Sequence, residues 1–263
     1  MKRIVVLLFI FSSLHTIAQT WEFEVLTGTT VYRGDLTDQI VDIKSIRPGI
    51  NLNLKYKLSD QFYLRGGLAW GMVAANDNNN KDSLLVVRNL SFSSHVFEAN
   101  FCVEYLPLSI ELYDIAYPYL FAGVGLFHFN PSAKDNNGEK VFLQPLGTEG
   151  QGLPQYPSRK KYNRTQFCIP MGGGMTFVLN EKLKLSGEIG FRKIFTDYLD
   201  DVSNTYVDLV VLEAGSGKKS AEMSYRGSYS TNNEKPAQDG NIRGNSEKKD
   251  WYYFLGIKFS WSL

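Results

Sequence analysis

The side chains that could catalyse a reaction are few. After the first 18 residues the chain holds two histidines, His95 and His128, and three serines, Ser91, Ser93 and Ser94, precede the first of them closely. A serine beside a histidine can act as an activated nucleophile, as in an outer-membrane lipid hydrolase. The simpler interpretation, which we favour, is that these polar side chains face water at the base of a loop. We therefore predict no catalytic residues and no enzyme activity.

Four aspartates close together could offer oxygen ligands to calcium. They are Asp197, Asp200, Asp201 and Asp208. Their spacing does not match that of an EF-hand calcium loop, and aspartate is also a common residue in turns. We predict that these residues cap turns, and we predict neither a metal site nor a cofactor.

Two cysteines, Cys102 and Cys168, are present. In an oxidising compartment such a pair suggests a disulfide. In the strand arrangement derived below, however, the two lie on non-adjacent strands and at different depths. Their Cα atoms should then be further apart than the limit of roughly 7 Å for a bridge. We predict that both stay unbridged.

The N-terminus indicates export. Lys2 and Arg3 precede an apolar run over residues 4–11, and small residues lie at 16–18. This pattern is typical of a secretory signal peptide, which we assign to residues 1–18. No later stretch approaches the roughly 20 apolar residues of a membrane helix. The net charge of +1 gives no basic surface for nucleic acid.

Alternation of apolar and polar residues predicts β-strands along the whole remaining chain. The pattern is clearest at residues 50–58. The same period of two recurs over residues 21–25, 62–72, 97–105, 167–179, 183–191 and 251–263. Residues 117–129 are apolar on both faces and form a further expected strand. The total is eight, an even number of the kind that single-chain outer-membrane barrels have.

The expected connections alternate in length. Residues 59–61 and 180–182 are short turns and residues 106–116 are a moderate one. Between them lie four long polar segments, at residues 33–46, 75–87, 130–163 and 196–249. Short turns at one end and long loops at the other are typical of outer-membrane barrels, whereas such loops are uncommon in compact soluble domains.

We therefore predict an all-β fold for residues 19–263, an eight-stranded antiparallel transmembrane β-barrel of the outer membrane. Both termini should be periplasmic and the four long loops extracellular. Residues 214–249 are polar and rich in Gly, Ser and Asn. That composition predicts a flexible extracellular loop there.

Charged residues occupy the inward positions of the expected strands. They are the acids Glu22, Glu24, Glu98, Glu104 and Glu188 and the bases Lys55, Lys57, Arg65, Lys184, Arg192 and Lys258. An eight-stranded barrel has room inside only for side chains, and buried charges are costly unless they are paired. The near balance predicts a salt-bridged plug, mostly toward the periplasmic half, rather than an ion-selective lumen. We expect Glu22, Glu24 and Lys258 to meet there, joined by Lys55 or Lys57.

Four segments carry a resemblance to a known family. Two are long, at residues 143–153 (LQPLGTEGQGL) and 195–208 (FTDYLDDVSNTYVD), and two are short, at 32–36 (YRGDL) and 88–92 (RNLSF). Together they resemble the PorG family, outer-membrane barrels of the type IX (Por) secretion system. The resemblance implies a non-enzymatic barrel that anchors the periplasmic ring of PorK lipoprotein and PorN to the outer membrane. The insertion at 215–249 is longer than expected for that family, which leaves a paralogue with the same barrel open.

One turn on the expected periplasmic side of the barrel offers a surface for such a partner. Residues 106–116 are rich in apolar side chains for a turn that faces water, and exposed apolar groups often mark an interaction site. We predict the partner contact at Leu108, Ile110 and Tyr113, although these side chains could instead fold back onto the barrel rim or the surrounding lipid. Two other functions remain open: a general structural or adhesion barrel and an outer-membrane lipid hydrolase.

Overall fold

Eight long strands dominate the computed structural model, which describes residues 21–37, 39, 42–107, 115–227 and 238–263. They are β1 (Trp21–Arg33), β2 (Arg47–Lys57), β3 (Phe62–Asn76), β4 (Ser91–Tyr105), β5 (Ala116–Phe129), β8 (Thr165–Val178), β9 (Leu183–Ile194) and β10 (Trp251–Ser262). Two short strands, β6 (Ser132–Lys134) and β7 (Lys140–Phe142), form a hairpin beyond β5.

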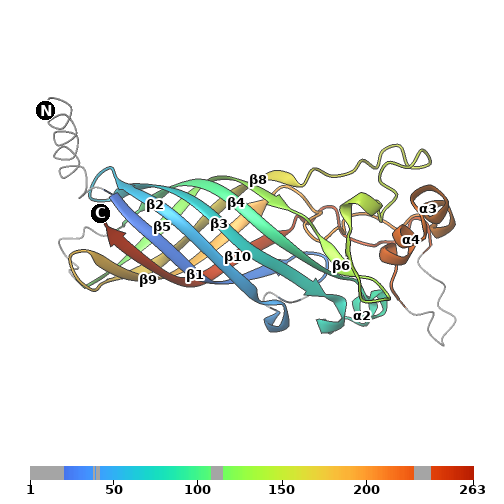
Figure 1. Cartoon of the computed structure of the whole chain (residues 1–263), viewed down its shortest axis with the longest axis horizontal. Coiled ribbons are helices and arrows are strands. Elements are labelled where there is room, and N and C mark those ends of the chain that lie inside the picture. Colours follow the sequence, from blue (N-terminus) through green and yellow to red (C-terminus); the bar gives the residue numbers. More distant parts are fainter. Residues whose placement is uncertain (1–20, 38, 40–41, 108–114, 228–237) are drawn as a thin grey trace, which may run out of the picture.

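The eight long strands close into a tube (Figure 1). Their order is β3-β2-β1-β10-β9-β8-β5-β4, and β3 pairs with β4 to complete the circle. Each of these pairings is antiparallel, and β1 pairs with β10 over twelve residues, from Glu22 to Arg33. The predicted eight-stranded antiparallel barrel is confirmed. Closure leaves no free sheet edge, as a lipid-embedded sheet requires.

Side chains alternate between an apolar outer wall and a largely polar interior. On β1, Phe23 is 42 % exposed, whereas Glu24 is fully buried. On β10, Phe259 and Trp261 point outward and Lys258 and Ser260 point inward. An apolar wall around a polar lumen is the arrangement of outer-membrane barrels.

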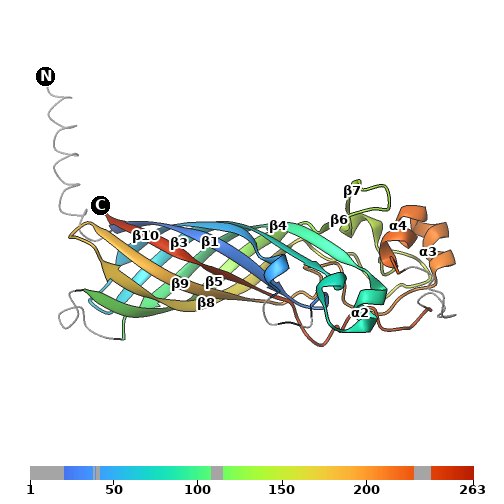
Figure 2. The same ribbon diagram turned by 90° about the horizontal axis from the view of Figure 1, so that it is seen from below.

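The two ends of the barrel differ in structure. At one end lie the short turns and the C-terminus, where the Leu263 amide donates to the carbonyl of Trp21. At the other end lie the long loops and the helices of the described residues (Figure 2). These are η2 (Ile43–Ser45), η3 (Asp77–Asn79), α2 (Ser83–Arg88), η5 (Gln144–Leu146), α3 (Leu209–Ser216) and α4 (Lys218–Ser224). No helix of the described residues is long and apolar enough to cross a membrane.

The described parts of residues 214–249 differ from the predicted flexible loop. The segment contains the end of α3 and all of α4, and Met223 and Arg243 are buried. Asp208 caps α3, and Leu212 on the helix packs with Leu153 of another loop. Polar composition predicted flexibility, but a few apolar and charged anchors fold these residues onto the other loops.

Candidate functional site

A network of buried charges fills the lumen near the short-turn end. Lys55 lies at its centre: its Nζ is 2.8 Å from Glu22, 3.2 Å from Glu24 and 3.2 Å from Glu104. Lys184 pairs with the other carboxylate oxygen of Glu22. One cation therefore joins carboxylates from β1 and β4.

Two further cations extend the network across the lumen. The Arg65 guanidinium lies 2.8 Å from Glu188 and 3.4 Å from Glu104. The Lys258 Nζ lies 3.1 Å from Glu188 and 3.2 Å from Glu24. The expected ionic contact among Glu22, Glu24 and Lys258 is present. Lys258 pairs directly with Glu24, and Lys55 links Glu24 to Glu22.

Aromatic rings complete the surroundings of these charges. The guanidinium of Arg65 lies 4.0 Å from the ring centre of Phe121, and the Lys258 Nζ lies 4.3 Å from that of Tyr119. The Tyr119 hydroxyl donates to Glu188 at 2.7 Å. The rings come from β5, the strand that looked apolar on both faces in the sequence. Its inward face therefore shields the ion pairs and contributes cation–π contacts.

Strand register produces the network. Glu22 lies opposite Lys55 on the neighbouring strand, and Lys55 lies opposite Arg65 on the next. Side chains directly opposite on one face of a sheet are close enough to interact. Glu22 and Lys55 thus meet directly, whereas the two cations Lys55 and Arg65 both contact the carboxylate of Glu104. No loop is needed to position these side chains.

A second, smaller ion pair lies further toward the loop end. Arg192 is 3.2 Å from Glu98, whose carboxylate also accepts from the Tyr252 hydroxyl at 2.6 Å and from the Asn100 amide at 2.7 Å. The Arg192 guanidinium lies 4.5 Å from the ring centre of Phe254. This pair is almost fully buried.

Lys57 is the exception among the predicted interior charges. It pairs at 2.8 Å with Asp60 in the adjacent turn, where both side chains reach water. The reason is that β2 ends at Lys57, so the inward position is already outside the lumen. The structure thus brings together ten of the eleven predicted side chains, five acids and five bases. None of the ten is more than 16 % exposed, so the lumen is filled by a neutral plug.

The long loops are joined by a second set of buried groups, which we call the outer cap. At its centre Glu149 accepts hydrogen bonds from the amides of Ser203 and Asn204, at 2.9 and 3.1 Å, and from the Tyr198 hydroxyl at 3.0 Å. Arg243 donates to the same carboxylate at 2.9 Å. These contacts connect the loop after β5 with the loop after β9.

Arg88 connects the remaining two loops to the outer cap. Its guanidinium makes a two-pronged pair with Asp77, with both contacts at 2.8 Å. It also donates to the backbone carbonyls of Asp35 and Arg243. One side chain therefore holds segments from three loops, and Arg rather than Lys offers enough donors for this.

Carboxyl groups outnumber cations in the outer cap. Burial raises the pKa of Asp197 to about 7, with a contribution from Asp35. Burial also raises the pKa of Asp201 to about 6, against the opposing effect of Arg243. The pKa of Asp250 is raised well above its usual range by burial and by the charge of Asp200. Several of these groups are therefore protonated at a pH where free aspartates are charged.

The aspartates of the last loop act as turn and cap residues. Asp208 accepts from the amides of Val210 and Val211 at the start of α3, and Asp200 accepts from the amide of Val202. In the described part of the chain, no group of three or more His, Cys, Asp or Glu side chains could hold a metal ion. The turn-capping prediction is confirmed for these two residues.

The two histidines lie apart from any serine nucleophile. The His95 ring stacks on Trp70 with ring centres 5.8 Å apart, and the His128 Nδ1 lies 3.0 Å from the Thr165 hydroxyl. Both side chains are exposed. Within the described residues, no hydrogen bond joins either imidazole to a serine hydroxyl.

Both cysteines are free and buried, so the prediction of no bridge is confirmed. Cys102 pairs with Gly123 on one side of β5, and Cys168 pairs with Gly125 on the other. The intervening strand separates them by about 9–10 Å, twice the spacing of adjacent strands. Along β5 the two pairing positions, Gly123 and Gly125, are two residues apart.

The predicted partner contact lies outside the described residues, which omit Leu108, Ile110 and Tyr113 as well as the signal peptide over 1–18. The end of the same turn is described, and Ile115 there is 77 % exposed.

The chain is similar to one sequence family and to several solved structures. A family model described as "Domain of unknown function (DUF6089)" matches residues 1–144. No curated protein matches the chain. Among solved structures, Neisserial surface protein A is 9 % identical with a TM-score of 0.45, covering 92 % of this chain and 97 % of that one.

Two other solved structures have similar values. A major outer membrane protein of Thermus thermophilus is 13 % identical with a TM-score of 0.43, covering 92 % of this chain and 98 % of its own. The attachment invasion locus protein Ail of Yersinia pestis is 9 % identical with a TM-score of 0.40, covering 92 % and 99 %.

Proposed function

The chain belongs to the DUF6089 family, and we propose that it is a non-enzymatic outer-membrane barrel of the type IX secretion system. In this proposal it anchors the periplasmic ring, formed by proteins of the PorK and PorN type, to the outer membrane. The observation that supports an anchor rather than a channel is the neutral plug of ten buried charges across the lumen.

The four segments that resemble the PorG family have a common place in the structure. Glu149 and Tyr198 come from the two long segments, and Tyr32 and Arg88 come from the two short ones. Tyr32 donates to Asp200 at 2.5 Å, so all four segments meet in the outer cap. Their contacts with one another in the buried outer cap give a physical reason why this chain carries all four segments.

The orientation in the membrane is part of the proposal. Short turns at one end and long loops at the other favour periplasmic termini and an extracellular outer cap. A ring in the periplasm could then reach only the short turns and the termini. The turn at residues 106–116 is the longest of these, which is why we place the partner contact at Leu108, Ile110 and Tyr113.

Export of type IX cargo tests the secretion role. Deletion of the gene should stop export, and the wild-type chain should restore it. Photo-crosslinkers at Leu108 and Tyr113 should capture a ring component in cells. A crosslinker at Ile242, which is 81 % exposed in the outer cap, is the matched control and should capture none. Normal export in the deletion strain would overturn the proposal, and capture only from Ile242 would overturn the orientation or the partner.

An adhesion barrel is the second candidate, and one observation favours it. The long loops that the outer cap joins expose large apolar side chains, with Ile43 79 %, Leu84 76 % and Val210 78 % exposed. Such groups often mark an interaction site. Adhesion would be indicated if the deletion strain lost surface binding while its export stayed intact.

A further inference from the structure

The outer wall formed by β1, β10 and β9 changes character in three successive rows of paired residues. The first row holds Thr29, Leu255 and Ile189, the second Val31, Tyr253 and Phe191, and the third Arg33, Trp251 and Lys193. On β10 and β9 the wall thus passes from the aliphatic Leu255 and Ile189 to the aromatic Tyr253 and Phe191, and the last row adds the basic Arg33 and Lys193 beside Trp251. Val31 in the second row is buried. Hydrocarbon, interface and charged headgroups follow one another in the same order in a membrane.

The length of β10 places the basic row at the level of the headgroups. Trp251 and Trp261 lie ten residues apart on the outward face. At about 3.3 Å per residue and a tilt of about 40°, they are separated by roughly 25 Å along the membrane normal. This matches the height of the apolar band of an outer-membrane barrel, so Trp251 and its basic neighbours lie at one interface.

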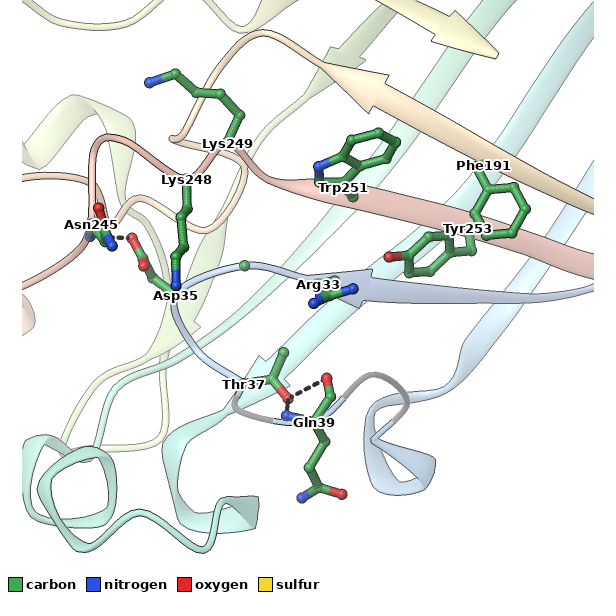
Figure 3. A pocket seen from close by; sticks show the side chains of 11 residues that line it. Arg33, Asp35, Thr37, Gln39, Phe191, Asn245, Lys248, Lys249, Trp251 and Tyr253 are labelled. Atoms are coloured by element: carbon green, nitrogen blue, oxygen red, sulfur yellow. Dashed lines mark hydrogen bonds between the residues drawn. The ribbon is translucent and has the colours of Figure 1, made fainter. Parts of the chain in front are cut away.

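A pocket opens beside this row (Figure 3). It has a volume of about 760 Å³. Its basic lining residues are Arg33, Lys248 and Lys249, and its aromatic lining residues are Trp251, Tyr253 and Phe191. Lys193, in the same row, does not line the pocket, but its Nζ lies 5.9 Å from the ring centre of the lining residue Trp251.

The cations around the pocket lack acidic partners. In the described residues no salt bridge joins Arg33, Lys193 or Lys248 to a carboxylate, and Lys249 donates only to the Ser246 carbonyl. Asp35 is the one acidic lining residue, and its carboxylate accepts from the Asn245 amide at 2.9 Å. The lining therefore holds three cations, Arg33, Lys248 and Lys249, against the single carboxyl of Asp35, beside an aromatic wall.

We infer that this pocket binds the phosphate headgroup of a phosphorylated glycolipid in the outer leaflet. The cations would contact the phosphate, and Trp251, Tyr253 and Phe191 would contact the sugar rings and the first carbons of the acyl chains. A soluble phosphate would use the cations but leave the aromatic wall unused. The inference rests on the orientation given under the proposed function, in which the outer cap faces the cell exterior.

Native mass spectrometry of the full chain in detergent tests this inference. The probes are bisphosphorylated lipid A, the same lipid after removal of its phosphates, and inorganic phosphate. The test variant combines Arg33→Gln, Lys193→Gln and Lys248→Gln. The control variant combines Lys134→Gln, Lys140→Gln and Lys160→Gln, which removes the same charge from exposed residues at the same end of the barrel. Heat-modifiable migration on gels establishes that each variant is folded.

We expect the wild-type and control proteins to retain the bisphosphorylated lipid, and the test variant to bind it about 100-fold more weakly. Loss of the lipid phosphates should weaken binding by the wild type to a similar degree. Equal binding by the test variant and the wild type, or equal binding of inorganic phosphate and the lipid, would overturn the inference. Lipid binding is measured on purified protein and secretion in cells, so a failure of the secretion role can be told apart from a failure of lipid binding.

Discussion

The lumen and the outer cap both bury charged groups, but they balance them differently. In the lumen, five acids face five bases, and cations such as Lys55 and Lys258 bridge several carboxylates. In the outer cap, Arg88 and Arg243 face a larger number of carboxyls, and burial raises the pKa of Asp197 and Asp201. In the lumen every acid is paired with a base, and the paired side chains fill the space. In the outer cap the surplus carboxyls can be protonated, so the stability of the cap depends on pH.

Breaking the lumen network should have the largest effect. Arg65→Met leaves Glu104 and Glu188 buried without that partner. Removing one member of a buried pair typically costs 3–5 kcal/mol, so we expect the free energy of unfolding to fall by about that amount. Urea unfolding of the barrel in detergent, followed by its migration on gels, measures the change.

Two further variants show whether the loss comes from unpaired charge. Arg65→Met combined with Glu188→Met removes opposite charges together and should recover part of the stability. Lys57→Met breaks only the exposed pair with Asp60 and should change little. Equal losses for Arg65→Met and Lys57→Met would refute the difference between lumen and rim.

Breaking the outer cap should loosen loops without unfolding the barrel. Glu149→Gln removes the charge that faces Arg243 and weakens the acceptor for two backbone amides. We expect the cap to open more readily by about 2–3 kcal/mol, while the barrel keeps its urea midpoint. The rate of limited proteolysis in the long loops measures the opening. Lys219→Gln, which removes a half-exposed lysine from its pair with Asp135, is the control. A lowered barrel midpoint in Glu149→Gln would contradict the separation of the two regions.

The pH dependence of the cap is a smaller effect with a definite sign. The pKa of Asp197 is raised from 3.8 to about 7 in the folded protein, so the folded state holds more protons than the unfolded one between these values. Stability from this group is complete below about 3.8 and is lost as the pH rises to about 7. We expect the cap to open several-fold more often at pH 8 than at pH 5, measured by hydrogen exchange corrected for intrinsic rates. Asp197→Asn should flatten this dependence, and an unchanged slope in that variant would assign it to another group.

The fold could be predicted because the alternation of apolar and polar residues along a strand can be seen within a short stretch of sequence. Alternation located seven of the eight long strands, and the apolar run at 117–129 indicated the eighth. The inward positions of the alternation placed ten of the eleven predicted charges in the lumen. The prediction was wrong for Lys57, because alternation does not show at which residue the barrel wall ends and the turn begins. The short β6–β7 hairpin was missed, since three residues are too few to show a period.

The outer cap could not be predicted because its contacts are not local. Glu149 and Arg243 are 94 residues apart and come from different loops, and no periodicity relates such positions. Polar composition predicted a flexible segment at 214–249, although Arg243 within it is 3 % exposed. Glu149, Tyr198, Arg88 and Tyr32 all come from the four segments at 143–153, 195–208, 88–92 and 32–36 that the sequence analysis singled out.

The cysteines lie within the lumen, where Cys102 is opposite Arg65 on the neighbouring strand, and they should have the smallest effect on stability. Cys102 and Cys168 flank β5 at Gly123 and Gly125, close to the level of the Glu98–Arg192 pair, with an intervening strand that prevents a bridge. We therefore expect a reductant to leave the urea midpoint unchanged, and alkylation of unfolded, unreduced protein to label both thiols by mass spectrometry. An intramolecular disulfide would require β4 and β8 to be adjacent. That would break the strand order on which both the lumen network and its separation from the outer cap depend.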